Sequence, residues 1–390
     1  QHLRAFPIDS NSKNSTKIMD AGEGVSHRRD ASLLRQSRID AHYSEDKYRF
    51  YIITLYSLGM FSNAIQWITF SPISDELKKI YDVPSLSVEL NSLLFMILFL
   101  PVGFPSEYAI DTWGPRTGLF IGASFTLVGG WLRCLIDINF HLVYIGQVLS
   151  AIGQPFFMNV PAKLGAIWFK PEHRTMATTV ASIANPIGAA IGFLIPSFFI
   201  TESTDLKADG KSQVLKLIIC EAIIATVISL SIFLFFKSKP RLPPSRTACV
   251  EKESFRDSLR DMARNPEFWK LFFAFSVGLG VFNTLSTIIN PLLKPYGYSS
   301  SDSSFMAAIC IGAGLAGAIV FGAYVDATKK FRRSYTILLI GSFGALLGLG
   351  FILQTRIIGL GMVFIAVLGF MMMPLLPLGY DLACEITYPV

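Results

Sequence analysis

Long apolar runs recur along the chain from about residue 50 onward, and they constrain the fold more than any other feature of the sequence. A helix of about 20 apolar residues crosses the hydrocarbon core of a bilayer. Ten stretches approach that length, which predicts an all-α membrane protein. The predicted spans cover residues 50–73, 86–110, 116–136, 141–165, 175–200, 213–236, 266–292, 303–325, 334–353 and 357–380.

The composition agrees with a membrane protein. Only 16% of the 390 residues are charged and 52% are hydrophobic, whereas soluble domains carry about 25% charged residues. The five cysteines show no paired or metal-like spacing, so we expect isolated apolar side chains or reduced thiols. A net charge of +6 would suggest nucleic acid as partner of a soluble protein. Here the basic residues collect on one side of the membrane, and we expect no nucleic-acid partner.

The distribution of lysine and arginine predicts the orientation. The polar tail at residues 1–48 and the long segment 237–265 are both rich in basic residues, and basic residues favour the cytosolic side. We therefore expect a disordered cytosolic tail and a cytosolic linker. Phe255, Leu259 and Met262 recur at helical spacing in that linker, which predicts an amphipathic helix on the membrane surface.

Amides and an indole lie within the first apolar run. Asn63, Gln66 and Trp67 stand three and four residues apart, which places them on one helix face. Amides inside a bilayer are costly unless they face protein or a water-filled cavity, so we interpret this face as one wall of a solute-binding cavity. Two alternatives stay open: Asn63 and Gln66 join neighbouring helices, and Trp67 packs or anchors at the membrane interface.

Two short turns of similar pattern lie six spans apart. Asp111–Arg116 follows the second span and Asp326–Arg333 follows the eighth, and each places an acid at the end of one span and a base at the start of the next. Such a repeat predicts two pseudo-symmetric six-helix bundles joined by the 237–265 linker, as in a major facilitator transporter. We expect the bundles at residues 49–236 and 266–390.

The repeat carries two further expectations. Asp111, Gly114 and Arg116 in the first turn, and Asp326 in the second, are expected to stabilise one state of a gate; the alternative is an ordinary charged turn that fixes the orientation. The second bundle has only about four spans, so the last two helices of the architecture are expected to be missing, through truncation or an incomplete gene prediction. A true ten-span protein is the alternative.

Five motifs together resemble one family. They are Asn63–Ile68, Asp111–Arg116, Gly130–Cys134, Gly280–Thr287 and Glu385–Pro389. In their order and spacing they resemble the feline leukaemia virus subgroup C receptor family of the major facilitator superfamily. The resemblance covers nearly all of the membrane part of the chain.

This resemblance implies a transporter of choline and, in some members, ethanolamine; heme export has also been attributed to the family. It places Trp67 against a quaternary ammonium and Gln154 on the pocket wall. Asn283 stands where the choline transporters have a tyrosine that closes the aromatic cage. Losing an aromatic face removes about 0.5–2 kcal/mol of cation binding, which weakens the choline assignment and leaves the transporter assignment unchanged.

Other residues narrow the possible functions. Glu221 lies well inside a span and suggests a cation site or a proton carrier, or else a structural role. Asn185–Pro186, followed by small residues, predicts a bendable fifth span that packs closely on a partner helix. The five histidines lie in the tail or in turns, which disfavours heme in a central cavity. The sequence contains no catalytic or phosphate-binding motif, so we expect neither an enzyme nor a cofactor or metal site.

The leading hypothesis is a facilitative transporter of a small organic cation or amino alcohol, similar to choline or ethanolamine, that works by alternating access. Trp67 would contact the cation, while Asn63, Gln66, Gln154 and Asn283 would meet its hydroxyl or ammonium groups. The alternatives are an exporter of heme or another organic solute, and a non-transporting receptor or sensor of the same fold. We expect a monomer, with the plasma membrane as its location.

Overall fold

The computed structural model describes residues 46–200, 206–242, 244, 260 and 262–387. The predicted tail and most of the predicted amphipathic helix, Phe255 and Leu259 included, lie outside these residues. The described residues form helices and no strand, which confirms the all-α prediction. The helices are α2 (Tyr48–Ile68), α3 (Ser74–Tyr81), α4 (Ser85–Trp113), α5 (Pro115–Arg133), α6 (Val143–Met158), α7 (Pro161–Trp168), α8 (Pro171–Phe199), α9 (Leu206–Phe235), α11 (Pro266–Leu293), α12 (Ser300–Thr328), α13 (Phe331–Leu353), α14 (Ile358–Met372) and α15 (Leu375–Thr387).

Each predicted span falls on this set of helices, but three of the spans are broken into separate pieces and a fourth, α11, is kinked at Ile288. The first ends at Ile68, and Pro72 separates it from the short helix α3. The fourth breaks between α6 and α7, where Pro161 starts the second piece, and the tenth breaks at Pro374 between α14 and α15. Proline lacks a backbone N–H and clashes with the preceding turn, which explains why these apolar runs do not continue as one helix. Among the described residues, eight helices are long and apolar enough to cross a membrane.

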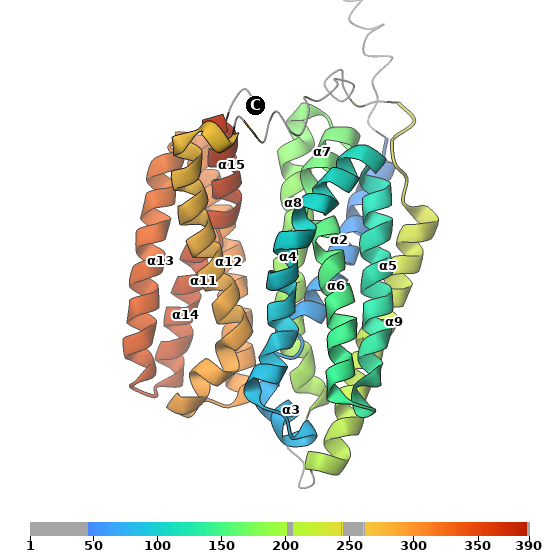
Figure 1. Ribbon diagram of the computed structural model, residues 1–390. Coiled ribbons are helices and arrows are strands. Elements are labelled where there is room, and N and C mark those ends of the chain that lie inside the picture. Colours follow the sequence, from blue (N-terminus) through green and yellow to red (C-terminus); the bar gives the residue numbers. More distant parts are fainter. Residues whose placement is uncertain (1–45, 201–205, 243, 245–259, 261, 388–390) are drawn as a thin grey trace, which may run out of the picture.

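The helices form two bundles that stand side by side (Figure 1). Helices α2 to α9 make up the first bundle, and α11 to α15, drawn in orange to red, make up the second. We call the end of the molecule that carries α3 the α3 end, and the opposite end, which carries α7, the α7 end (Figure 1). Within the first bundle α2 packs against α6, α8 and α9, and most of its residues from Ile52 to Ile68 are buried.

A buried ion pair fixes the α3 end of α2. The Arg133 guanidinium donates from Nη1 to Glu221 Oε2 at 2.9 Å, and the two side chains are 0% and 2% exposed. Thr69 Oγ1 donates to the other carboxylate oxygen at 2.7 Å, and the guanidinium carbon lies 4.7 Å from the centre of the Phe70 ring. Glu221 is therefore neutralised by Arg133, which supports the structural role over a free cation site or proton carrier.

The two bundles are joined near α3 by a set of polar contacts between residues 71–75 and residues 286–294, which we call the α3 seal. Ser71 Oγ lies 2.9 Å from the Ser286 carbonyl oxygen and 2.7 Å from the Thr287 carbonyl oxygen. Asn290 Nδ2 donates to the Pro72 carbonyl oxygen at 3.0 Å. An ion pair of 2.7 Å between Lys294 and Asp75 extends the seal.

The sequence of α11 explains why its backbone is available to the first bundle. In a regular helix the N–H of residue 291 would bond to the Thr287 carbonyl, but this residue is Pro291 and has no N–H. The backbone at Ile288, with φ −108° and ψ 18°, also leaves the helical range. The carbonyl group that the proline leaves free accepts its hydrogen bond from Ser71 across the bundle interface.

We expect removal of one partner of the buried ion pair to be strongly destabilising. Arg133→Met should cost about 3–5 kcal/mol in unfolding free energy, because it leaves the Glu221 carboxylate buried without a counter-charge. Adding Glu221→Leu should recover part of that loss. Thermal unfolding of the protein in detergent measures both variants. A double variant that unfolds at a lower temperature than Arg133→Met would contradict this account.

We expect Asn290→Ala to weaken the α3 seal, because each lost hydrogen bond contributes about 0.5–1.5 kcal/mol. The measurement is the distance distribution between spin labels at the exposed positions Thr117 and Thr336, which lie in the first two turns of α5 and α13 after the two repeated turns, with the five native cysteines replaced by serine. A second, shorter distance should gain population as the bundles close at the α7 end. Asn91→Ala is the matched control, because that buried amide bonds to carbonyl groups of its own helix. Equal distributions in the Asn290→Ala and unsubstituted proteins would exclude a gating role for the seal.

Candidate functional site

A cavity of about 230 Å³ lies between the two bundles. Its walls come from α2, α4, α6 and α8 of the first bundle and from α11, α14 and α15 of the second. Both bundles therefore contribute to one site, as alternating access requires. The lining residues are Trp67, Phe95, Met96, Phe99, Gln154, Met158, Asn185, Pro186, Ala189, Phe275, Gly278, Leu279, Phe282, Asn283, Met372, Met373, Leu375 and Leu376.

The cavity wall combines aromatic rings, thioethers and a few neutral amides. Five of the lining residues are aromatic and four are methionine, whereas three carry an amide and none carries a charge. Aromatic faces attract cations through the ring quadrupole, and methionine side chains adapt to irregular shapes. The wall suits a solute with an apolar or cationic surface and one or two hydrogen-bonding groups.

Trp67 is held in the wall by reciprocal hydrogen bonds with α4. Its ring Nε1 donates to the Ser92 carbonyl oxygen at 3.2 Å, and Ser92 Oγ donates to the Trp67 carbonyl oxygen at 3.1 Å. The polar edge of the indole is thus paired with protein, and the residue is 6% exposed. An indole fixed in this way is preorganised as an apolar and electron-rich part of the wall.

Asn63 and Gln66 do not line this cavity, which corrects their expected placement. Asn63 Nδ2 donates to Thr126 Oγ1 at 3.0 Å and to the Ser150 carbonyl oxygen at 2.9 Å. Gln66 Oε1 accepts from Ser150 Oγ at 2.6 Å, and its Nε2 donates to the Thr126 carbonyl oxygen at 3.3 Å. Successive residues of a helix point about 100° apart, so Gln66 faces α5 and α6 while Trp67 faces the cavity. These contacts support the alternative interpretation of both amides, in which they join neighbouring helices.

The structure brings Trp67, Gln154 and Asn283 together on the cavity wall, from α2, α6 and α11. It adds Asn185 of α8, which the sequence indicated only as part of a bendable, closely packed segment. The Asn185 side-chain nitrogen is buried and has no hydrogen-bond partner among the described residues. The sequence did contain a signal for Asn185, because it is an amide within an apolar run, which is also the feature that drew attention to Asn63.

The turn between α4 and α5 pairs with α7. Asp111 forms an ion pair of 2.8 Å with Lys163, which also contacts Glu107 one helical turn earlier on α4. Gly114 has a φ of +86°, a conformation that favours glycine, and the Arg116 guanidinium lies 5.0 Å from the centre of the Phe120 ring. The partner of Asp111 therefore comes from α7. In the second turn, the side chain of Asp326 lies outside the described part of the structure.

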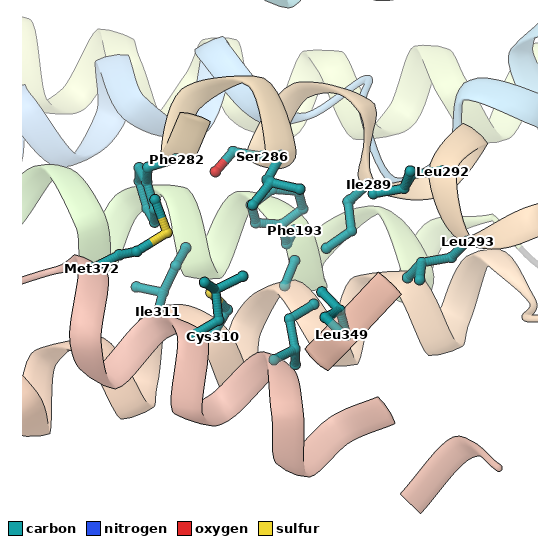
Figure 2. Close-up of a pocket in the computed structure, with 14 residues that line it drawn as sticks. Phe193, Phe282, Ser286, Ile289, Leu292, Leu293, Cys310, Ile311, Leu349 and Met372 are labelled. Atoms are coloured by element: carbon teal, nitrogen blue, oxygen red, sulfur yellow. The ribbon is translucent and has the colours of Figure 1, made fainter. Parts of the chain in front are cut away.

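A smaller apolar gap of about 20 Å³ lies between α8 and the second bundle, beside the kink of α11 (Figure 2). Phe282 and Met372 line both this gap and the main cavity. Figure 2 shows Phe193 of α8 among side chains from α11 and α12. The gap has room for about one water molecule, but apolar voids of this kind stay dry. It marks looser packing beside the segment of α11 that carries the α3 seal.

Comparisons with known proteins agree with the fold. Residues 56–388 match the Major Facilitator Superfamily. The chain is similar to the choline/ethanolamine transporter FLVCR1 of Felis catus, with 30% identity over 98% of this chain and 69% of the relative. It is 29% identical to the FLVCR1 protein of Mus musculus, over 87% of this chain and 65% of that one. The chain thus spans about two thirds of the length of these relatives.

A solved structure shows the same fold. The bacterial homologue of the human lysosomal transporter Spinster, in an inward-facing and unoccupied conformation, matches with a TM-score of 0.64 and 16% identity. The match covers 87% of this chain and 75% of that protein. The helices, the cavity between two bundles and these similarities lead to one conclusion: the chain belongs to the major facilitator superfamily and, within it, to the family of the FLVCR transporters.

Proposed function

We propose that the protein is a facilitative transporter of a small organic cation or amino alcohol, similar to choline or ethanolamine, that works by alternating access. The observation that carries the proposal is the cavity walled by both bundles, with a fixed indole and neutral amides on its surface. The names of the relatives, which are choline/ethanolamine transporters, support the substrate class.

Binding in this cavity rests on the Trp67 ring and the amides of Gln154 and Asn283, which form the proposed substrate-binding set. A cation over one aromatic face gains about 0.5–2 kcal/mol. Because none of the described residues that line the cavity is charged, this part of the wall supplies neither a salt bridge to the substrate nor a proton carrier. Uniport driven by the concentration gradient of the substrate is the mechanism that requires the fewest functional groups in the cavity, because it needs no site for a coupled ion or proton.

Alternating access follows from the two ends of the bundle interface. The α3 seal closes one end through Ser71 and Asn290. The positive-inside rule places the amino-terminal tail in the cytosol, and the α7 end with it, so the sealed end faces outward. The two bundles, residues 49–236 and 266–390, would rock around the cavity, in a monomer in the plasma membrane.

The gate at the α7 end is proposed to involve the two repeated turns. The ion pair between Asp111 and Lys163 ties α4 to α7, and Gly114 provides the sharp turn between α4 and α5. Arg116 and Asp326 complete the proposed set on the cytosolic face. Closing the two bundles at this end while the α3 seal opens at the other would exchange the two access states.

Heme as cargo of this cavity has less support. None of the described residues that line it is histidine, cysteine or tyrosine, which are common protein ligands of heme iron. His141 and His173 are exposed residues outside the cavity. The methionines of the wall are the remaining candidate ligands, and they fit equally well as adaptable apolar lining.

We expect Trp67→Ala to weaken the apparent affinity for choline about 2- to 30-fold, because the change removes the cation–π contact of about 0.5–2 kcal/mol. Trp67→Phe, which keeps a smaller ring, should lose less. The measurement is saturable uptake of labelled choline and ethanolamine by cells that express the protein. Trp131→Ala is the control, since this half-exposed indole of α5 lies outside the cavity. Unchanged saturable uptake by Trp67→Ala would remove this residue from the site.

A further inference from the structure

We propose that Asn185 of α8 is a further substrate-contacting residue, which hydrogen-bonds the hydroxyl end of an amino alcohol while Trp67 receives its ammonium end. The inference rests on the proposed function and assigns the substrate's orientation in the cavity. It gives a role to a side chain that the sequence indicated only as part of a packing segment.

The first observation is the unpaired state of the Asn185 side-chain nitrogen. This nitrogen is buried and has no hydrogen-bond partner among the described residues, although the residue lines the cavity. The side-chain nitrogens of Asn63 and Asn290, in contrast, each donate to neighbouring helices. A buried donor without an acceptor is costly, so an unpaired amide nitrogen on a residue that lines a cavity points to a ligand that accepts its hydrogen bond.

The second observation is the depth of Asn185 along the cavity. Helices α2 and α8 run in parallel. Two glycines of α8 pack closely on α2, and their contacts show which residues of the two helices lie at the same level. Gly188 lies against Ala64 and Gly192 against Ile68. Asn185 is almost one turn before Gly188, which places it nearer the α7 end, at the level of residues 58–61 of α2.

Gln154 lies in the same layer. Tyr56 of α2 donates its hydroxyl to the Phe157 carbonyl oxygen at 2.8 Å, and Asn63 donates to the Ser150 carbonyl oxygen at 2.9 Å. Helix α6 therefore runs antiparallel to α2, and Gln154, midway between residues 150 and 157, lies at the level of residues 58–61. Two amides from different helices thus share one layer on the side of the cavity toward the α7 end.

Trp67 lies deeper, toward the α3 end. It is about two turns beyond the amide layer along α2, or roughly 10 Å at 1.5 Å per residue. An ammonium group can lie up to about 6 Å from the ring centre, and a hydroxyl group lies about 2.8 Å from its hydrogen-bond partner. The distance that remains between the ammonium and the hydroxyl suits a two-carbon link. The cavity thereby fits an amino alcohol with its cation toward the sealed end and its hydroxyl toward Asn185 and Gln154.

The test compares choline with ethyltrimethylammonium, which has the same cationic end and lacks the hydroxyl. Each compound competes with labelled choline for uptake by cells that express the unsubstituted protein or Asn185→Ala. We expect the substitution to weaken choline about 2- to 10-fold, the usual range for one hydrogen bond. The affinity for ethyltrimethylammonium should stay unchanged. Asn185→Ser, which keeps a hydrogen-bonding group, should restore part of the preference for choline.

The control is Asn63→Ala, which removes a paired amide between helices. It should lower thermal stability in detergent and leave the ratio of the two affinities unchanged. Equal weakening of both compounds by Asn185→Ala would overturn the proposed contact, because a packing defect does not distinguish a hydroxyl from a hydrogen. Equal affinities of the two compounds for the unsubstituted protein would also overturn it, even if the alanine variant does not fold. Absence of saturable choline uptake by the unsubstituted protein would overturn the proposed function, and this inference with it.

Discussion

The hydrogen bond from Ser71 to the Thr287 carbonyl is the contact on which the relation of the two bundles depends. It exists because Pro291 removes the N–H that would otherwise occupy this carbonyl. Asn290 adds a bond in the opposite direction, from the second bundle to the Pro72 carbonyl. The missing N–H of Pro291 thus leaves a free carbonyl acceptor on α11, and the hydrogen bond that this carbonyl accepts from Ser71 holds the bundles together at one end of the cavity.

Helix α2 connects the seal to the site. One face bonds to α5 and α6 through Asn63 and Gln66, and Trp67 faces the cavity with its indole nitrogen bonded to α4. The buried pair of Arg133 and Glu221 fixes the residues that follow, between the indole and the seal. The amides and charges buried inside the first bundle are paired with one another, with hydroxyl groups or with backbone groups, which offsets the free-energy cost of burying them. The same contacts hold α2 in place and so position the Trp67 ring in the cavity wall.

The sequence predicted the positions of the helices because long apolar runs are the main signal of membrane spans, and eight of the described helices are long and apolar enough to cross a membrane. It did not predict the breaks at Pro161 and Pro374, since proline is tolerated in some membrane helices and breaks others. The sequence also did not predict which side of α2 faces the cavity. Gln66 and Trp67 are adjacent in sequence, and only the neighbouring helices determine which of them meets the cavity. Asn185 was missed for the same reason, because its packing partners and the lack of a partner for its side-chain nitrogen among the described residues are properties of the assembled bundle.

The central claim is that a solute binds between the bundles, with its cationic end against Trp67 and the α3 seal closed. A cryo-electron microscopy structure of the protein with saturating choline tests this most directly. The account predicts ligand density in the cavity next to the indole, with the Ser71 and Asn290 contacts intact while the cavity communicates with the α7 end. Density for choline only outside the cavity, or a cavity filled by protein side chains in the choline-bound state, would contradict it.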